Sequence, residues 1–411
     1  MEPTPKLKTS AALRFIFITI FIDVMGLAII IPVIPDLLRE LGHVDYAAAS
    51  GINGLLTATY ACMQVLFSPV MGNLSDRFGR RPIMLISLLG FSIDYTFMAF
   101  APTVFWLFIG RTIAGITGAT MATATAYIAD ISTGDKRAAN FGIVGAASGL
   151  GFIIGVSGGA FLGEINIKFP FMVAAAAALI NAAYGYFVLP ESLDKEHRRK
   201  FEWKRANPIG SFRQLGKYSS LAGLAVAFTL VYIAQKAVEY QLPFYVYEKF
   251  EWSKKSVGFL GLFIGMLLIF IQGYLIRYLI PKWGLVRNIF VGLISYGVGL
   301  TLIAFASYGW MIYIYMIPYC FGGISGPALQ GFITNKFAPN EQGELQGGLS
   351  LLSSLSLIIG PVLMGYTFNI FTLKDSSAYF PGAPYILGAL LMFIATLLAA
   401  RSIKQLSNPA R

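Results

Sequence analysis

The chain has 411 residues, of which 56% are hydrophobic and only 12% are charged, and its formal net charge is +11 at pH 7. Such a composition excludes an ordinary soluble protein. The positive charge would suit a nucleic acid, but the basic residues follow the ends of long apolar runs, so we expect a lipid bilayer as partner and no nucleic acid.

Cysteine and histidine are too rare to suggest bound metal. The two cysteines, Cys62 and Cys320, both lie inside apolar runs, and the two histidines, His43 and His197, form no ligand cluster. This pattern predicts no disulfide framework, no metal site and no cofactor. The polar start followed by a very long apolar run is not typical of a cleavable signal peptide.

The apolar runs predict an all-α membrane protein with twelve transmembrane helices in two pseudo-symmetric six-helix halves. Each run can cross a bilayer core of about 30 Å as a helix. We place the halves at 1–190 and 219–411, joined by a basic cytoplasmic linker at 191–218. The expected spans are 12–35, 48–71, 82–101, 104–129, 138–163, 169–189, 219–246, 255–280, 288–306, 309–334, 344–370 and 382–402.

The distribution of Lys and Arg predicts the orientation. On this topology 23 of the 31 basic residues fall on the face that carries both termini, and six fall on the opposite face. Cytoplasmic loops are the ones enriched in Lys and Arg. We therefore expect a multi-pass protein of a cell membrane, most simply a bacterial inner membrane, with both termini in the cytoplasm.

The first half contains charged residues inside apolar spans. Asp23 lies midway along span one, Asp94 in span three and Arg111 in span four. A charge in a span is costly, so each requires a partner or a water-filled cavity. A carboxyl group whose surroundings change can bind and release a proton. We interpret all three as a proton-coupling site formed around Asp23 and Arg111; a fixed ion pair that only joins helices is the alternative.

The polar loop at 72–82 joins spans two and three and carries three arginines within five positions. Its two glycines allow a tight turn and close helix approach. Its single aspartate can accept from the free N–H groups of a helix start or pair with an arginine. We predict that the loop is a gating motif composed of Gly72, Asp76, Arg77, Gly79, Arg80 and Arg81.

The two halves resemble each other internally. Gly115-Ile116-Thr117-Gly118 in span four is matched by Gly323-Ile324-Ser325-Gly326 in span ten, and Gly155 corresponds to Gly360. Two similar halves predict a substrate site between them near the bilayer midplane. Coincidental glycine patterning is the alternative, since glycine is common in membrane helices.

The linker and span seven add further charges. The run Glu196–Lys200 with Trp203 is typical of an interfacial amphipathic helix on anionic headgroups. Lys236 and Glu239 lie three residues apart on span seven and hence on one face. They line a cavity or brace helices, and the sequence leaves both open.

Several amides and tyrosines are candidate cavity linings, although interhelical hydrogen bonding is an equally good role for each. Tyr60 and Tyr240 belong to this group. The predicted substrate-binding residues are Gln64, Tyr95, Gln235, Lys236, Glu239 and Gln272.

The loop at 72–82 resembles the signature G-x-x-x-D-R-x-G-R-R of the major facilitator superfamily. Further segments resemble the tetracycline-efflux branch of its drug/proton antiporters: Asp23-Val24-Met25-Gly26, Pro32-Val33-Ile34-Pro35, Met63-Gln64-Val65, Asp94-Tyr95, Gly110-Arg111, Gly115-Ile116-Thr117-Gly118-Ala119, Pro327-Ala328-Leu329-Gln330-Gly331 and Leu345-Gln346-Gly347. The resemblance covers nearly the whole chain. It implies that Asp23, Asp94 and Arg111 are functional and that Asp76 gates the cytoplasmic side.

Two features depart from that branch. Its members carry a histidine in helix 8 and an aspartate in helix 9, whereas Met266–Ile269 holds no histidine and Ser295–Gly297 no acid. The antiporter motif of helix 5 normally reads Gly-Pro, and this chain has Gly155-Val156. The resemblance therefore leaves the transported compound open.

These observations favour secondary active transport, with proton-coupled export of a small organic compound by alternating access as the expected function. The partners are the small-molecule substrate and protons, and we expect a monomer that is not an enzyme. No G-x-x-x-x-G-K-[ST] loop occurs, which disfavours ATP-driven pumping. The alternatives are proton-coupled import of an anionic or zwitterionic solute, with Lys236 supplying the positive charge, and a membrane receptor without turnover.

Overall fold

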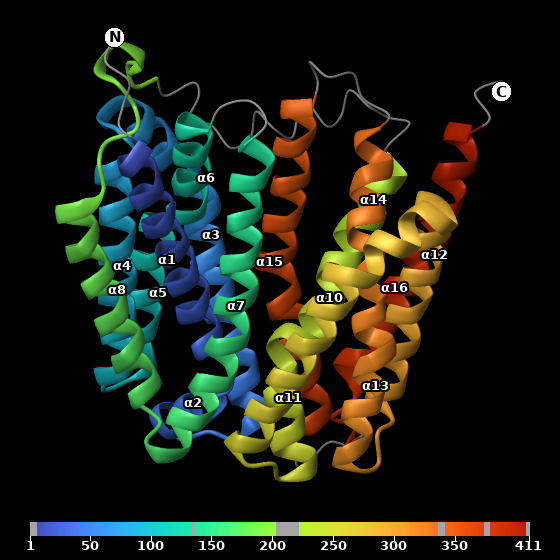
Figure 1. Ribbon diagram of the computed structural model, residues 1–411. Coiled ribbons are helices and arrows are strands. Elements are labelled where there is room, and N and C mark those ends of the chain that lie inside the picture. Colours follow the sequence, from blue (N-terminus) through green and yellow to red (C-terminus); the bar gives the residue numbers. More distant parts are fainter. Residues whose placement is uncertain (1–5, 133–135, 203–221, 336–341, 374–378, 408–411) are drawn as a thin grey trace. The chain divides into compact units, whose positions relative to one another are not determined.

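In the computed structural model, residues 6–132, 136–202, 222–335, 342–373 and 379–407 are described, and within these ranges the chain is helical and forms no strand (Figure 1). The first half contains α1 (Lys6–Ile29), α2 (Ile34–Gly42), α3 (Tyr46–Phe78), α4 (Arg80–Phe100), α5 (Val104–Thr117), α6 (Thr120–Ile131), α7 (Lys136–Ile165) and α8 (Phe169–Val188). After the linker follow α10 (Ala222–Phe250), α11 (Lys254–Leu268), η3 (Ile269–Leu275), α12 (Ile276–Ala304), α13 (Gly309–Phe321), η4 (Gly322–Ile324), α14 (Ser325–Thr334), α15 (Gln342–Thr372) and α16 (Ala383–Ser407).

The helices confirm the predicted all-α membrane architecture. Eleven stretches of the described chain are long and apolar enough to span a bilayer, and one of them, Lys254–Ala304, has 51 residues. At a rise of about 1.5 Å per residue this stretch would be roughly 76 Å long, more than twice a bilayer core. The helix is interrupted at Gly284, whose φ is 72°. The 51-residue stretch therefore supplies two spans, which brings the number of spans in the described chain to twelve.

The first span is shorter than the sequence predicts. α1 ends at Ile29 rather than continuing to 35, and a separate nine-residue helix, α2, begins at Ile34. Pro32 and Pro35 explain the break, because proline lacks the N–H that continues a helix and disfavours helical geometry in the residue before it.

Spans four and ten are interrupted at the repeated glycine motif. α5 gives way to α6 at Gly118 and Ala119, and α13 gives way to α14 through the 3₁₀ turn Gly322–Ile324. The packing repeats as well: α1 with α7, α1 with α8 and α4 with α8 correspond to α10 with α15, α10 with α16 and α12 with α16. Matching breaks and pairings confirm the internal repeat.

Glycines on α7 bring its backbone against α1. A Cβ atom at Gly151 would come within 2.6 Å of the Phe21 carbonyl oxygen, and one at Gly155 within 2.5 Å of the Met25 carbonyl oxygen. Small residues spaced four apart permit such close helix contacts in membranes. The segment of α1 that carries Asp23 is thereby fixed against α7.

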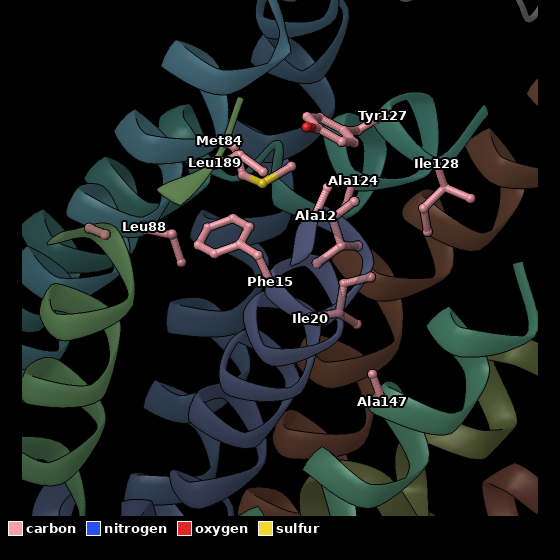
Figure 2. Close-up of a cluster of buried hydrophobic side chains, with 12 residues drawn as sticks. Ala12, Phe15, Ile20, Met84, Leu88, Ala124, Tyr127, Ile128, Ala147 and Leu189 are labelled. Atoms are coloured by element: carbon pink, nitrogen blue, oxygen red, sulfur yellow. The ribbon is translucent and has the colours of Figure 1, made fainter. Parts of the chain in front are cut away.

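The cluster in Figure 2 joins five helices of the first half, α1, α4, α6, α7 and α8. The Phe15 ring of α1 lies among Met84 and Leu88 of α4 and Leu189, which follows α8. Tyr127 of α6 belongs to the same cluster and is 1% exposed. This packing holds one end of α1, α4 and α6 together with the end of α8.

The chain forms two compact units, which we describe separately. Unit 1 comprises residues 1–43, 59–208 and 254–262, and unit 2 comprises 44–58, 209–253 and 263–411. The start of α3 belongs to unit 2 because Ser50 Oγ lies 2.7 Å from Gln241 Oε1 and 3.1 Å from the Gly365 carbonyl oxygen. The start of α11 belongs to unit 1, where Lys254 Nζ pairs with Asp36 at 2.6 Å.

The described part of the linker is not the helix that the sequence predicts. Lys195–His197 forms a single 3₁₀ turn, and residues 198–202 continue without helical structure. A hydrogen bond to the end of α3 replaces a helical one here, as Arg199 N donates to the Asp76 carbonyl oxygen at 3.1 Å. Trp203 and the residues up to 221 lie outside the described chain.

Candidate functional site

Arg111 and Asp94 form a buried two-point ion pair in unit 1. Arg111 Nε donates to Asp94 Oδ1 at 3.1 Å, and its Nη2 donates to Oδ2. The Asp94 side chain is fully enclosed and that of Arg111 is 8% exposed. Parallel N–H···O bonds of this kind fix geometry as well as charge. The sequence interpretation centred on Asp23 and Arg111, but the carboxylate that closes on the guanidinium is Asp94.

The ion pair continues into a polar network that reaches α3. The Arg111 guanidinium carbon lies 5.5 Å from the centre of the Tyr60 ring. Gln64 Nε2 lies 3.1 Å from the Tyr60 hydroxyl and 3.2 Å from the Gly118 carbonyl oxygen, at the break in span four. Gln64 therefore joins two helices in this structure, the alternative that the sequence left open beside substrate binding.

Asp23 is buried but differently placed. Asp23 is 8% exposed, and its side-chain atom Oδ1 has no hydrogen-bond partner. The Tyr95 hydroxyl, also buried and without a partner, lies where a Cβ atom at Gly26 would overlap it. Glycine at 26 thus lets Tyr95 of α4 approach α1 one turn from Asp23. The sequence pattern alone does not indicate this contact.

Unit 2 contains the second charged pair. Lys236 Nζ is paired with Glu239 and lies 5.7 Å from the centre of the Tyr240 ring. A Cβ atom at Gly360 would come within 2.5 Å of Lys236 Cγ, so the glycine of α15 accommodates the lysine stem. The lysine side chain is 10% exposed and the glutamate side chain 39%, so Lys236 is the enclosed partner.

The remaining predicted amides also lie in unit 2. Gln235 Nε2 donates to the Tyr296 hydroxyl at 3.2 Å, and the Tyr296 ring packs edge-on against Tyr319. Gln272 lies on the π-helical turn η3, with its Nε2 3.4 Å from where a Cβ atom at Gly323 would stand. Single π-helical turns often occur at functional sites. Gln235, Lys236 and Glu239 on α10 and Gln272 on η3 thus belong to one compact unit, whereas Gln64 and Tyr95 belong to the other.

Residues 72–82, predicted from the sequence as a loop, are helical except for Gly79, because α3 continues to Phe78 and α4 begins at Arg80. They form an ion-pair network within unit 1. Arg80 Nη1 lies 2.6 Å from Asp76 Oδ1, and Arg80 Nε lies 3.2 Å from Asp130 Oδ2. Arg81 Nη2 donates to the Tyr186 carbonyl oxygen, and Arg77 stacks on the Phe78 ring at 5.0 Å. Of the two roles that the sequence allows Asp76, this structure shows the pairing with arginine.

Two acidic residues of this network were missed from the sequence. Asp130, at the end of α6, binds Arg80, and Glu191 accepts hydrogen bonds from the backbone N–H groups of Arg80 and Arg81. Both acids stand at the ends of apolar runs, where sequence reasoning treats a charge as solvent-exposed. The available signal was their placement beside a strongly basic loop on the same predicted face.

Comparison with known families agrees with this architecture. The sequence model of the Major Facilitator Superfamily matches residues 16–361. The chain belongs to the major facilitator superfamily. Tetracycline resistance protein, class C, of Escherichia coli is 37% identical over 388 residues, covering 94% of this chain and 96% of that protein. Multidrug resistance protein 2 of Bacillus subtilis (strain 168) is 31% identical over 359 residues, covering 85% and 87%.

Solved structures of other transporters show the same fold. The human organic anion transporter TETRAN has a TM-score of 0.71 at 21% identity, with 96% of this chain and all (100%) of that chain covered. The nucleoside transporter NupG has a TM-score of 0.76 at 13% identity, with 96% and 99% covered. The protein is therefore a multi-pass secondary transporter and not an enzyme.

Proposed function

We propose that this transporter exports a small organic compound from a bacterial cytoplasm in exchange for protons, as a monomer in the inner membrane with both termini inside. The observation that carries the proposal is the contrast between two buried acids, Asp94 paired with Arg111 and Asp23 with an unpartnered Oδ1. The names of the bacterial relatives, which are resistance proteins, support export and a drug-like substrate.

The contrast assigns different tasks to the two acids. A buried carboxylate is stable when paired, so Asp94 with Arg111 forms a fixed positive and negative element. An unpaired charge in an apolar environment is costly, and a proton removes that charge. Asp23 therefore takes up a proton in one state of the cycle and releases it in another, when water or a cation reaches it.

Substrate binding and gating are assigned to the other predicted residues. Gln64, Tyr95, Gln235, Lys236, Glu239 and Gln272 contact the substrate in turn as access alternates. The gating motif, Gly72, Asp76, Arg77, Gly79, Arg80 and Arg81, controls the cytoplasmic side. The Lys236–Glu239 pair supports a substrate that carries a charge or a strong dipole, since either partner can exchange its bond for one to the ligand.

The test is transport in proteoliposomes with an imposed pH gradient, scanned over a panel of cationic, zwitterionic and anionic compounds. Vesicles of inverted orientation with an acidic interior should accumulate at least one compound, and collapse of the gradient by an ionophore should abolish the accumulation. Accumulation driven by the opposite gradient would show import instead, and the absence of gradient-dependent movement for every compound would contradict coupled transport.

A further inference from the structure

The start of α4 lacks a capping side chain of its own. The residue at the N-cap is Gly79, so the first N–H groups of this 21-residue helix have no local acceptor. Glu191 supplies one from 111 positions later in the sequence. Its Oε1 accepts from Arg80 N at 2.7 Å, and its Oε2 accepts from Arg81 N at 3.2 Å.

The same carboxylate also folds the first residues of the linker. Glu191 Oε1 accepts from Ser192 N and from Leu193 N, both at 3.1 Å. The preceding residue is anchored as well, because the Tyr127 hydroxyl donates to the Pro190 carbonyl oxygen at 2.8 Å. Tyr127 belongs to the core cluster of Figure 2, so its bond to Pro190 fixes the point at which the chain leaves that core, one residue before Glu191.

Beyond Glu191 the linker follows the end of α3. Arg199 N donates to the Asp76 carbonyl oxygen at 3.1 Å, and Asn73 Nδ2 donates to the Glu202 carbonyl oxygen at 2.8 Å. Ser192 Oγ adds a bond to Asp130 Oδ2 at 3.0 Å. The segment 190–202 thus lies on the gating motif at several points, on both sides of Gly79.

Gly79 is required at this junction for two reasons. Its φ of 110° is a conformation that residues with a side chain rarely adopt. A Cβ atom at this position would in addition overlap Glu191 Oε2. The glycine therefore leaves room for the carboxylate as well as allowing the turn.

We propose that Glu191 is a positioning residue that joins the linker segment 190–202 to the gating motif, so that the two move as one piece during the transport cycle. The part played in transport rests on the proposed function, but the junction itself does not. Glu191 caps α4 and also binds the backbone of the residues that follow it. It therefore transmits any displacement of the α3–α4 junction at Gly79 directly to the linker.

Hydrogen–deuterium exchange of the purified protein tests the junction without any substrate. In Glu191→Ala, exchange of peptides spanning 79–82 and 190–199 should accelerate together, by roughly tenfold or more, the factor expected when bonds to a charged acceptor are lost. Peptides from α10 to α16 should not change. Glu196→Ala is the matched control, because Glu196 is exposed in the same segment and no hydrogen bond joins its side chain to the described part of the gating motif.

Transport then separates positioning from general stability. Glu191→Ala should lower the maximal rate with the KM for a transported compound unchanged and the melting temperature close to wild type, whereas Glu196→Ala should alter none of these. If Glu191→Ala does not fold, Glu191→Gln carries the test: it keeps one acceptor oxygen and should exchange at an intermediate rate. Exchange at wild-type rates in both Glu191 variants would overturn the junction. Wild-type transport in a variant with accelerated exchange would overturn its part in the cycle.

Discussion

At the scale of single residues, the two acids of unit 1 show that burial alone does not define a role. Asp94 and Asp23 are both buried, yet Asp94 is neutralised by a guanidinium, and Asp23 Oδ1 faces no donor. Removing one partner of a buried ion pair typically costs about 3–5 kcal/mol, because a charge is left unpaired. An unpartnered carboxyl carries no such structural bond on that oxygen, so its substitution should act on function first.

Asp23→Asn should abolish gradient-driven accumulation while leaving counterflow intact. The substitution keeps the size of the side chain and removes its ability to carry a proton, and counterflow requires no net proton movement. Both assays should be run in the same proteoliposomes with a compound identified from the panel.

The control is Glu164→Gln, at an exposed acid near the end of α7 in the same unit. It should leave both assays as in wild type. Undiminished gradient-driven accumulation in Asp23→Asn would exclude Asp23 from coupling, and loss of counterflow along with accumulation would indicate a defect in binding or folding.

The pair on α10 should respond unequally to loss of its two partners. Glu239→Gln leaves the enclosed Lys236 unpaired, and a lone charge in a span costs about 2.5–3.5 kcal/mol on insertion scales. Lys236→Met leaves only the more exposed Glu239, so it should lower the melting temperature less and should change which compounds are transported.

Thermal unfolding in detergent and the transport panel measure the two effects together. The double substitution Lys236→Met, Glu239→Gln should be more stable than Glu239→Gln alone. Equal destabilisation by both single changes with an unaltered substrate profile would assign the pair to helix bracing, the alternative left open by the sequence.

At the scale of elements, the contact of α7 with α1 positions Asp23. Gly155→Val would force its Cβ atom into the Met25 carbonyl oxygen, and such overpacking commonly costs about 1–3 kcal/mol. Gly149→Val, two turns away on the same helix, points into open space with no atom within 4 Å. The first variant should therefore unfold at a lower temperature and couple poorly, and the second should resemble wild type.

The melting temperature and the gradient-driven transport of each variant test whether the contact of α7 with α1 is required. Equal melting temperatures for the two valine variants would mean that α7 does not rest on α1 as described.

The elements also show where sequence reasoning succeeds and where it stops. Long apolar runs and two glycine motifs were sufficient for the spans and for the internal repeat, since both are local signals. The end of α1 at Ile29 was missed because Pro32 and Pro35 lie within an unbroken apolar run. The partner of Arg111 and the cap supplied by Glu191 could not be derived, because each depends on which faces of separate helices meet.

At the scale of the whole molecule, the charge distribution predicts a defined orientation. Lys200 in the linker and Lys255 at the start of α11 are both exposed, on faces that we expect to be cytoplasmic and external, respectively. In a chain whose free cysteines, Cys62 and Cys320, are replaced by alanine, Lys200→Cys should react with a membrane-impermeant maleimide only in inverted vesicles. Lys255→Cys should react in intact cells, and the reverse pattern would refute the orientation.

The membership of α3 in two compact units has a consequence for the order in which the protein is made. Ser50, near the start of α3, finds its partners Gln241 and Gly365 only 191 and 315 residues later. At roughly 5–20 residues per second, a ribosome reaches the first partner on the order of 10–40 s after Ser50 and the second roughly 15–65 s after it. Until then the early turns of α3 stand in the bilayer without the chain they pack against. α3 is thus synthesised early, but its packing is completed only after α10 and α15 have been made. Substitutions near its start should therefore impair the maturation of the nascent protein more than the stability of the folded protein.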